Sequence, residues 1–475
     1  MSDLLRVEGL QIAFTVHGHA IEAVKGVSFR VRPGSVVAIV GESGSGKSVT
    51  AQAIMGILPH VGDITAGRIL FADPAGNGAA VDIAALPRDS DAMRALRGSR
   101  MTMIFQEPMS SLSPLHTIGN QVAEALTTHI PAARGTARAQ SEETLALVGF
   151  PDPKRAFDMY PFELSGGLRQ RAMIAMAVIC RPALLVADEP TTALDVTIQA
   201  QVLNLLKSLQ SRFGMAMLLI THDLGVVANM ADEIVVMYGG EVMEAGPAGA
   251  IFRRPAHPYL KALLKAVPHF DMEPGERLVS LRDARGDGPV VSRPLEPRSA
   301  VASGEILLAV RDIRKAFTTQ KGSWFGKSEE RKTYAVNGVS FDIKRGECLG
   351  LVGESGCGKT TVSKIIMRAL TPDSGSVVFR DGTAEIDLAK LEGRALTDFR
   401  TRIQMVFQDP VSSLSPRMTV LNILREPLQI HGRGNRREQV ERAAESMRAV
   451  GLDPRFLNRY PHSFSGGQRQ RIGIA

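Results

Sequence analysis

The chain has 475 residues, of which 44% are hydrophobic and 22% charged, and its formal net charge is +7. These values are ordinary for a globular protein of two or three domains. The longest apolar runs fall well short of the ~20 residues that span a bilayer, and the N-terminus lacks the pattern of a signal peptide. The positive charge favours acidic partners such as nucleotide phosphates, nucleic acid or an anionic membrane surface, but a solvated basic surface is the simpler alternative.

The chain contains three cysteines, Cys180, Cys348 and Cys357, which lie far apart and form no metal-type spacing. Such sparse cysteines indicate a reducing compartment without a disulfide framework, so we expect the protein in the cytoplasm.

The first chemical motif is GESGSGKS at residues 41–48, between the apolar run SVVAIV and the helical pattern VTAQAIMGIL. It fits the pattern G-x-x-x-x-G-K-[ST] in the strand–loop–helix context of a phosphate-binding loop. Its glycines allow successive backbone N–H groups to point at phosphates, and the following helix adds its positive end. Lys47 would reach the terminal phosphates, and the Ser48 hydroxyl would ligate Mg²⁺. The nucleotide-binding residues expected here are Gly41, Glu42, Ser43, Gly44, Ser45, Gly46, Lys47, Ser48 and Val49.

The second chemical motif is the stretch ALLVADEPTTALD at residues 183–195, an apolar run that ends in Asp188 and Glu189. A buried strand that ends in two acids fits the ligand edge of a parallel sheet. Asp188 would hold Mg²⁺, and Glu189 would act on the attacking water as general base. A further apolar run, MLLITHD at 217–223, carries His222 near its end. We expect His222 to contact the γ-phosphate and the water; a structural histidine is the alternative.

A domain-sized repeat relates the two halves of the chain. The matching stretches are 24–48 with 336–360, 101–118 with 403–420, and 160–171 with 460–471. Two phosphate-loop motifs in context leave little weight for a chance glycine-rich turn. The second loop contributes Gly353, Glu354, Ser355, Gly356, Cys357, Gly358, Lys359, Thr360 and Thr361. Cys357 is expected to serve as a small structural residue and not as a redox sensor.

The segment 271–305 is rich in Pro, Gly and charge, so we interpret it as a linker between domains at 1–270 and 306–475. The stretches 137–149 and 436–450 are typical of amphipathic helices. A basic stretch around Trp324 could contact lipid or a membrane protein, although a solvated loop is the preferred interpretation.

Together with the signatures LSGGLRQR and FSGGQRQR, these motifs resemble the nucleotide-binding subunits of ABC transporters. The resemblance implies an α/β P-loop NTPase fold, duplicated in tandem, with a RecA-like parallel sheet, a small antiparallel β subdomain and a helical signature subdomain. It implies ATP and Mg²⁺ as cofactors, and catalytic roles for Glu189, His222, Lys47 and Gln106.

The same resemblance assigns further residues. Gln106 and Gln408 would be the Q-loop glutamines, which sense Mg²⁺ and contact the membrane partner, and Asp195 would belong to the D-loop. The signature residues would be Ser165, Gly166, Gly167, Ser465, Gly466 and Gly467, and the residues near Mg²⁺ would be Ser48, Gln106, Asp188, Thr360 and Gln408. Phe14 and Phe317 are candidates to stack on adenine.

The stretch FRRPAHPYLKALLKAVP at 252–268 is similar to the C-terminal segment of the oligopeptide/dipeptide importer subfamily. That resemblance implies two permease subunits, an extracytoplasmic solute-binding protein, and a peripheral place on the cytoplasmic face of the bacterial inner membrane, with no nucleic acid. The substrates of the subfamily include peptides, nickel chelates, glutathione and peptide-like antibiotics. Leu168 departs from the usual signature glutamine, and Ser113 and Ser415 stand where asparagine is common.

In this family two domains bind ATP head to tail, so each site combines one phosphate loop with the other half's signature. The site built on the first phosphate loop, 41–48, would then have all of its parts. For the site built on the second loop, 353–360, the acidic strand, D-loop and switch histidine would lie after residue 475. A fragment of a longer fused protein is the preferred explanation, and a half-degenerate ATPase is the alternative. We expect a stable first half and a poorly folded second half with exposed apolar edges.

A soluble ABC protein of translation or DNA repair is the alternative function. Translation-type members carry a longer, strongly charged helical linker, and repair-type members carry zinc-binding cysteines. The short Pro/Gly-rich linker, the three cysteines and the HPY segment favour the importer.

Overall fold

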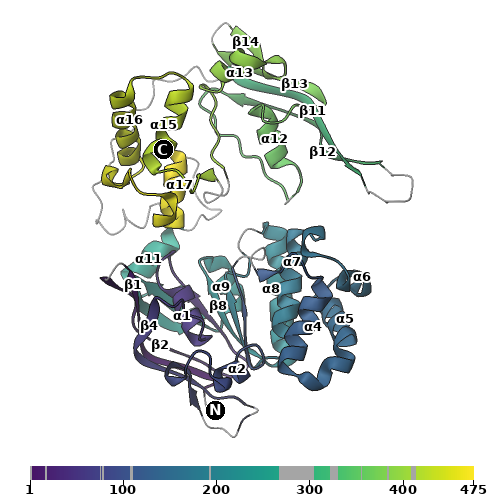
Figure 1. Cartoon of the computed structure of the whole chain (residues 1–475), viewed down its shortest axis with the longest axis vertical. Helices are drawn as coiled ribbons and strands as arrows, with labels where there is room; N and C mark the ends of the chain where they lie inside the picture. The colour runs from purple at the N-terminus through teal and green to yellow at the C-terminus, as the bar shows by residue number, and fades with distance from the viewer. Residues whose placement is uncertain are drawn as a thin grey trace. The chain divides into compact units, whose positions relative to one another are not determined.

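The computed structural model describes residues 3–16, 19–74, 76, 80–106, 111–191, 194–266, 304–320, 330–354, 356–381, 384–407 and 413–475. The chain forms two compact units, Met1–Val291 and Ser292–Ala475, which are described separately below (Figure 1). Ser355, Gln408 and Trp324 lie outside the described residues, as does the expected linker except for residues 304 and 305.

The first unit contains an antiparallel sheet with the strand order β2-β1-β4-β5. Its strands are β1 (Leu5–Val16), β2 (His19–Val31), β4 (Gly62–Phe71) and β5 (Val81–Asp82). A register shift lies between Val7 and Leu10 of β1. The shift moves the alternation of buried and exposed side chains along β1 by one residue. Leu10 and Ile12 are therefore buried on the same side as Leu5 and Val7. This sheet is the antiparallel subdomain that the sequence predicts.

The second sheet of the first unit has six strands in the order β10-β9-β3-β8-β7-β6. Its strands are β6 (Met101–Ile104), β7 (Leu184–Asp188), β8 (Ala216–Thr221), β9 (Glu233–Tyr238), β10 (Glu241–Pro247) and β3 (Val36–Val40). All neighbours are parallel except β10, which pairs antiparallel with β9 at one edge. Every residue of β3, β7 and β8 is buried, which explains their continuous apolar sequences.

The described helices of the first unit are α1 (Lys47–Ile54), α2 (Asp91–Leu96), α4 (Ile118–His129), α5 (Ala137–Leu147), α6 (Pro153–Phe157), α7 (Gly166–Val178), α8 (Val196–Phe213), α9 (Leu224–Met230), α10 (Ala248–Arg253) and α11 (Pro258–Lys265). Figure 1 shows α4, α5, α6 and α7 grouped on the side of the unit away from β1, β2 and β4. This group is the predicted helical subdomain. No helix in the described parts of the chain is both long and apolar enough to cross a membrane.

The second unit repeats the antiparallel sheet, in the order β12-β11-β13-β14. Its described elements are the strands β11 (Ile306–Gln320), β12 (Glu330–Lys344), β13 (Ser374–Asp381) and β14 (Ala384–Asp387), and the helices α12 (Lys359–Ile366), α13 (Gly393–Phe399), α15 (Val420–Ile430), α16 (Arg436–Ala449) and α17 (Gly466–Ile474). The predicted amphipathic helices of the two halves are therefore present as α5 and α16.

The second unit differs from the first at the segments 347–354 and 403–407, which correspond to β3 and β6. Neither segment forms a strand. Val352 is 89% exposed, whereas β3 is wholly buried, and Val406 is 56% exposed, whereas its counterpart Ile104 on β6 is 1% exposed. In the described part of the second unit no strand corresponds to β7, against which β6 pairs in the first unit. The expected exposure of apolar side chains is confirmed for these two segments.

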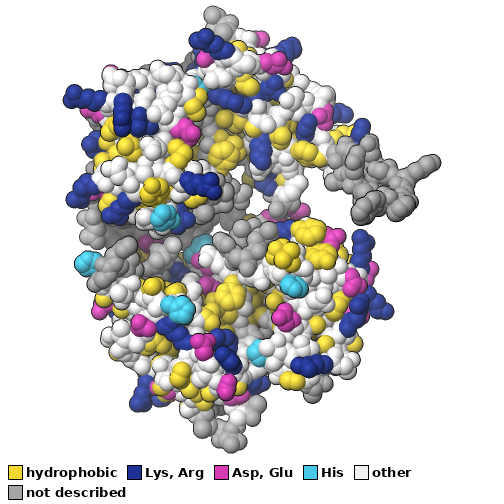
Figure 2. Space-filling view, viewed as in Figure 1, with side chains coloured by type: hydrophobic (Ala, Val, Ile, Leu, Met, Phe, Trp, Pro, Cys, Tyr) yellow, Lys and Arg dark blue, Asp and Glu magenta, His cyan; other side chains and the backbone are white. Residues whose placement is uncertain are grey.

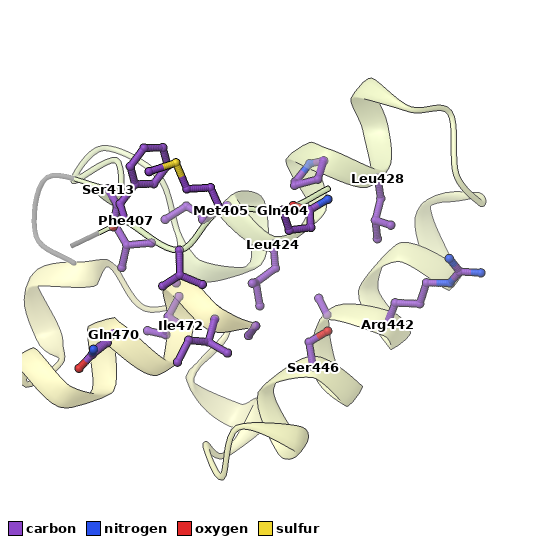
Figure 3. Close-up of a pocket in the computed structure, with 18 of the residues that line it drawn as sticks. Gln404, Met405, Phe407, Ser413, Leu424, Leu428, Arg442, Ser446, Gln470 and Ile472 are labelled. Carbon is purple, nitrogen blue, oxygen red and sulfur yellow. The ribbon is translucent and has the colours of Figure 1, made fainter. Parts of the chain in front are cut away.

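A cavity of about 700 Å³ in the second unit adjoins the segment 404–407 and the helices α15, α16 and α17. Figure 3 shows Met405 and Phe407 on the segment, Leu424 and Leu428 on α15, and Ile472 on α17 around this cavity. Polar side chains, among them Gln404, Arg442 and Gln470, share the lining of this cavity with the apolar ones.

Candidate nucleotide site

The first phosphate loop joins strand β3 to helix α1, as the sequence predicts. Gly46 caps α1 with φ of 94°, a left-handed conformation that favours glycine. A Cβ atom at Gly41 would lie 2.1 Å from the Met237 carbonyl oxygen of β9, so this position has no room for a side chain. The loop is therefore pressed against the sheet with its N–H groups at the start of α1, an arrangement that suits phosphate.

The Lys47 ammonium folds back over its own loop. Its Nζ donates to the carbonyl oxygens of Gly41 and Glu42, each at 2.7 Å, and to Ser45 Oγ at 3.3 Å. Burial lowers the pKa of Lys47, whereas Glu189, Asp188 and Glu42 raise it. The ammonium is thus largely desolvated, held by its own loop and under the influence of three acidic side chains.

Ser48 and Asp188 meet where α1 begins and β7 ends. The Ser48 hydroxyl donates to Asp188 Oδ1 at 3.1 Å, and only 5% of Asp188 is exposed. Burial raises the pKa of Asp188, the Ser48 hydrogen bond lowers it, and the Glu189 charge raises it further. A bound divalent cation would relieve this cost, because it neutralises the buried charge.

The two side chains fit Mg²⁺ held together with a nucleotide. Among the described residues no group of three or more His, Cys, Asp or Glu gathers as a metal cluster. Mg²⁺ usually takes only one or two protein ligands and fills its shell with water and phosphate oxygens. The hydroxyl of Ser48 and the carboxylate of Asp188 supply hard oxygens of that kind.

Glu189 is held by three groups from different elements. Its backbone φ is 46°, a left-handed conformation that is uncommon outside glycine, and its N–H donates to the Ile220 carbonyl oxygen at 2.9 Å. Gln106 Nε2 donates to Glu189 Oε2 at 3.0 Å, and His222 Nδ1 lies 3.1 Å from Oε1. The hydrogen bond to the Glu189 carboxylate is the main cause that raises the pKa of His222. The structure therefore joins three residues that sequence motifs place at separate strand ends.

Both signatures lie at helix N-termini. Ser165 caps α7 and accepts a hydrogen bond from the Leu168 N–H at 3.4 Å. Ser465 caps α17 in the same way, and Gln468 completes a capping box by accepting from the Ser465 N–H at 3.0 Å. The Leu168 side chain cannot accept a hydrogen bond. The first signature therefore lacks the bond that Gln468 accepts in the second, but it keeps the hydrogen bond to the capping serine.

The segment that follows the acidic strand makes two further hydrogen bonds, one with the signature helix and one at the start of α8. Gln170 Nε2 on α7 donates to the Pro190 carbonyl oxygen at 2.6 Å. Asp195 caps α8 and accepts from the Ile198 N–H at 2.9 Å. The segment that follows Glu189 is thus tied to two helix starts. Gly166 and Gly167 form the first turn of α7.

The second phosphate loop has the local geometry of the first. Lys359 Nζ donates to the Gly353 and Glu354 carbonyl oxygens at 2.5 and 2.7 Å, and Gly358 caps α12 with φ of 99°. Thr360 and Thr361 lie in the first turn of that helix. The Lys359 ammonium also lies 3.6 Å from Cys357 Sγ, in the place of the Ser45 hydroxyl. The loop conformation is therefore determined locally, because no strand precedes it here.

The two candidate adenine-stacking residues differ in their surroundings. Phe14 is partly buried against the core of the first unit, and a Cβ at Gly62 would lie 2.6 Å from its ring. Phe317 in the second unit is 44% exposed. Sequence reasoning missed Tyr259, whose hydroxyl accepts a hydrogen bond from the Glu42 N–H of the first loop at 3.3 Å. The HPY motif marked the residue, but nothing in the sequence placed it beside the loop.

Comparison with known proteins agrees with this geometry. The ABC transporter family model matches residues 24–192 and 336–475, and the model of the oligopeptide/dipeptide transporter C-terminal region matches 243–293. The glutathione import ATP-binding proteins GsiA of Salmonella paratyphi A and of Escherichia coli O1:K1 are each 44% identical over 100% of this chain and 75% of their own length.

A solved dimeric post-hydrolysis state of the ATP-binding cassette MJ0796, bound to ADP and phosphate, is 26% identical, with a TM-score of 0.45 over 51% of this chain and 98% of that chain. The two family matches and the two curated relatives establish what kind of protein this is. The chain belongs to the ABC transporter family, as an ATP-binding ATPase of the oligopeptide/dipeptide importer type with two cassette regions in tandem.

Proposed function

We propose that the protein drives import of peptides or peptide-like solutes, coupling ATP binding and hydrolysis to separate permease subunits. The observation that carries the proposal is the meeting of Gln106, Glu189 and His222 beside the first phosphate loop, in a chain that also matches the oligopeptide/dipeptide transporter C-terminal region. The curated relatives import glutathione by their names, so small peptides of that kind are the first substrates to test.

At the first site, ATP phosphates would lie on residues 41–49, with Lys47 at the terminal phosphates. Ser48, Asp188 and Gln106 would hold Mg²⁺, which supplies charge neutralisation at the phosphates when bound. Glu189 would accept a proton from the attacking water, while His222 would orient it and contact the γ-phosphate. The roles of Glu189, Gln106 and His222 agree with their contacts, since Glu189 lies between the amide of Gln106 and the imidazole of His222.

The second site would use Gly353–Thr361, with Thr360 and Gln408 near Mg²⁺. We propose domains at 1–270 and 306–475, joined by a linker at 271–305, that pair head to tail during turnover. Ser465, Gly466 and Gly467 would then complete the first site, and Ser165, Gly166 and Gly167 the second. The N–H groups at the start of a capped helix are suited to hold a γ-phosphate, which supports this assignment. Asp195 would lie next to the paired site.

The partners would be two integral membrane permease subunits and an extracytoplasmic solute-binding protein. The protein would then lie at the cytoplasmic face of the bacterial inner membrane as a peripheral subunit. No nucleic acid takes part. The segment around 243–293 supports the importer over a soluble ABC protein of translation or repair, because it matches the importer region.

A pull-down from detergent-solubilised membranes tests the proposal. Tagged protein with Glu189→Gln, which would retain ATP, should recover two integral membrane proteins. The same complex with Glu189 unchanged, reconstituted in lipid vesicles, should take up radiolabelled glutathione or a dipeptide. A matched sample without the tag controls for nonspecific recovery. Recovery of ribosomal proteins with no integral membrane protein would overturn the importer and favour the translation alternative.

A further inference from the structure

The C-terminal segment of the first unit is anchored to the sheet before α11 begins. The Glu244 carboxylate on β10 accepts hydrogen bonds from the backbone N–H groups of Ala256, at 3.1 Å, and His257, at 2.8 Å. His257 then caps α11, because its Nδ1 accepts from the Tyr259 N–H at 3.2 Å. The position of Tyr259 is therefore set by a charged anchor on the edge strand and by a helix cap.

The Tyr259 ring is part of the wall behind the first phosphate loop. Only 2% of the residue is exposed, and its ring packs on Tyr238 with 4.7 Å between centroids. Tyr238 ends β9 directly after Met237, whose carbonyl oxygen leaves no room for a Cβ at Gly41. The same short stretch of β9 therefore supports both the tyrosine and the start of the loop.

The Tyr259 hydroxyl contacts the loop itself. It accepts a hydrogen bond from the Glu42 N–H at 3.3 Å, and the Glu42 carbonyl oxygen accepts from Lys47 Nζ at 2.7 Å. Glu42 is thus held on one side by the lysine that would meet the phosphate and on the other by α11. We propose that Tyr259 is a positioning residue, which holds the first phosphate loop ready for nucleotide and links the C-terminal segment to nucleotide affinity.

The physical basis is preorganisation of the loop. Without the hydroxyl, the Glu42 N–H loses its partner, and the free loop samples conformations other than the one that binds phosphate. Nucleotide must then order the loop when it binds, which weakens affinity without a lost contact to nucleotide. A typical net hydrogen bond corresponds to roughly a threefold to tenfold change in Kd. The inference rests on the proposed placement of nucleotide phosphates on this loop.

The test uses the full chain with Lys359→Ala, so that the first loop dominates nucleotide binding. In this background Tyr259→Phe keeps the buried ring and removes only the hydroxyl. We expect the Kd for MgADP in titration calorimetry to rise roughly threefold to tenfold. Amide exchange of residues 41–46 in the nucleotide-free protein should become faster. Tyr334→Phe, at a 60% exposed tyrosine of the second unit, is the matched control and should change neither value.

A further variant covers the case in which Tyr259→Phe does not fold. Glu244→Gln weakens the hydrogen bonds that anchor the segment before α11, and it should raise the Kd by a smaller factor than Tyr259→Phe. If Tyr259→Phe changes neither the Kd nor the amide exchange of the loop, the inference is wrong, even if the Tm of the variant falls. Such a result would show that Tyr259 contributes only packing. Unchanged Kd in Lys47→Ala would instead contradict the proposed nucleotide site.

Discussion

Glu189 illustrates how the first site is built at the residue scale. Its left-handed φ of 46° costs roughly 1–2 kcal/mol in a residue with a Cβ. The conformation persists because the N–H is bound to Ile220 and both carboxylate oxygens have partners, Gln106 and His222. Strain that is maintained by several contacts is typical of functional positions. As the proposed base, Glu189 would have to exchange at least one of these partners for water during turnover.

Asp188 leads to a pH-dependent prediction for the nucleotide-free protein in EDTA. Burial raises the pKa of its carboxyl, so the acid contributes stability below its ordinary pKa of 3.8 and loses it as pH rises through the folded value. We expect Asp188→Asn to raise Tm at pH 7, because Asn can still accept from Ser48 without a buried charge. The gain in Tm should shrink as pH falls.

The control for this prediction is Asp63→Asn, at a side chain that is 75% exposed. Its Tm should follow that of the parent at each pH. A stabilisation by Asp188→Asn that stays constant from neutral to acidic pH would show that the buried charge is not its cause.

Two of the loop glycines, Gly41 and Gly44, allow backbone strain to be compared with steric crowding. Gly44 has φ of 84° and nothing within 4 Å of an added Cβ, so Gly44→Ala should cost roughly 1–2 kcal/mol from backbone strain alone. Gly41→Ala must displace the backbone of β9 and should cost more than about 3 kcal/mol. Urea denaturation followed by amide protection of β3 measures both. Equal losses would contradict the close packing of the loop on β9.

At the scale of elements, the strands that can be predicted are those whose own residues form a recognisable pattern. The continuous apolar runs of β3, β7 and β8 indicated buried parallel strands, and the structure confirms them. The contact between Gln106 and Glu189 depends on the pairing of β6 with β7, which no local pattern encodes. The hydrogen bond from the Glu42 N–H to Tyr259 joins residues 217 positions apart, and no local pattern encodes it either.

The second unit also separates features that depend on neighbouring residues from features that depend on long-range strand pairing. Its phosphate loop keeps the glycine cap and lysine contacts without a preceding strand, because these depend on neighbours within the loop. The strand itself needs partners on both sides, and the segments 347–354 and 403–407 have none in the described residues. Local motifs therefore predicted the loop, and long-range pairing decided the sheet.

These exposed segments predict a proteolysis pattern for the 475-residue polypeptide. Limited trypsin treatment should cut within the second unit first, for example after Arg402, and leave a resistant fragment that contains the first unit. Mass spectrometry of the fragments locates the cuts. A single resistant species of full length would contradict the expectation that the second half is less stable.

For the whole molecule, each unit has cores of its own. The first unit contains two large buried clusters, one that includes Leu219 and one that includes Ile39, and the second contains two smaller clusters, which include Val310 and Met447. Lys and Arg side chains are spread over the visible face of both units, interspersed with Asp and Glu (Figure 2). The positive net charge nevertheless belongs to the second unit by sequence, because residues 292–475 contain 30 Lys and Arg against 20 Asp and Glu, whereas residues 1–291 contain 26 against 29.

Glu189→Gln tests the central claim, that the first unit hydrolyses ATP with Glu189 as the base. The amide keeps the shape of the side chain and cannot accept the proton. The measurement is single-turnover hydrolysis of radiolabelled ATP by the full chain, beside its Kd for ATP, with Glu143→Gln on α5 as control. We expect an unchanged Kd and a rate reduced by at least about 100-fold, in the range of general-base catalysis. An unchanged hydrolysis rate would contradict the account.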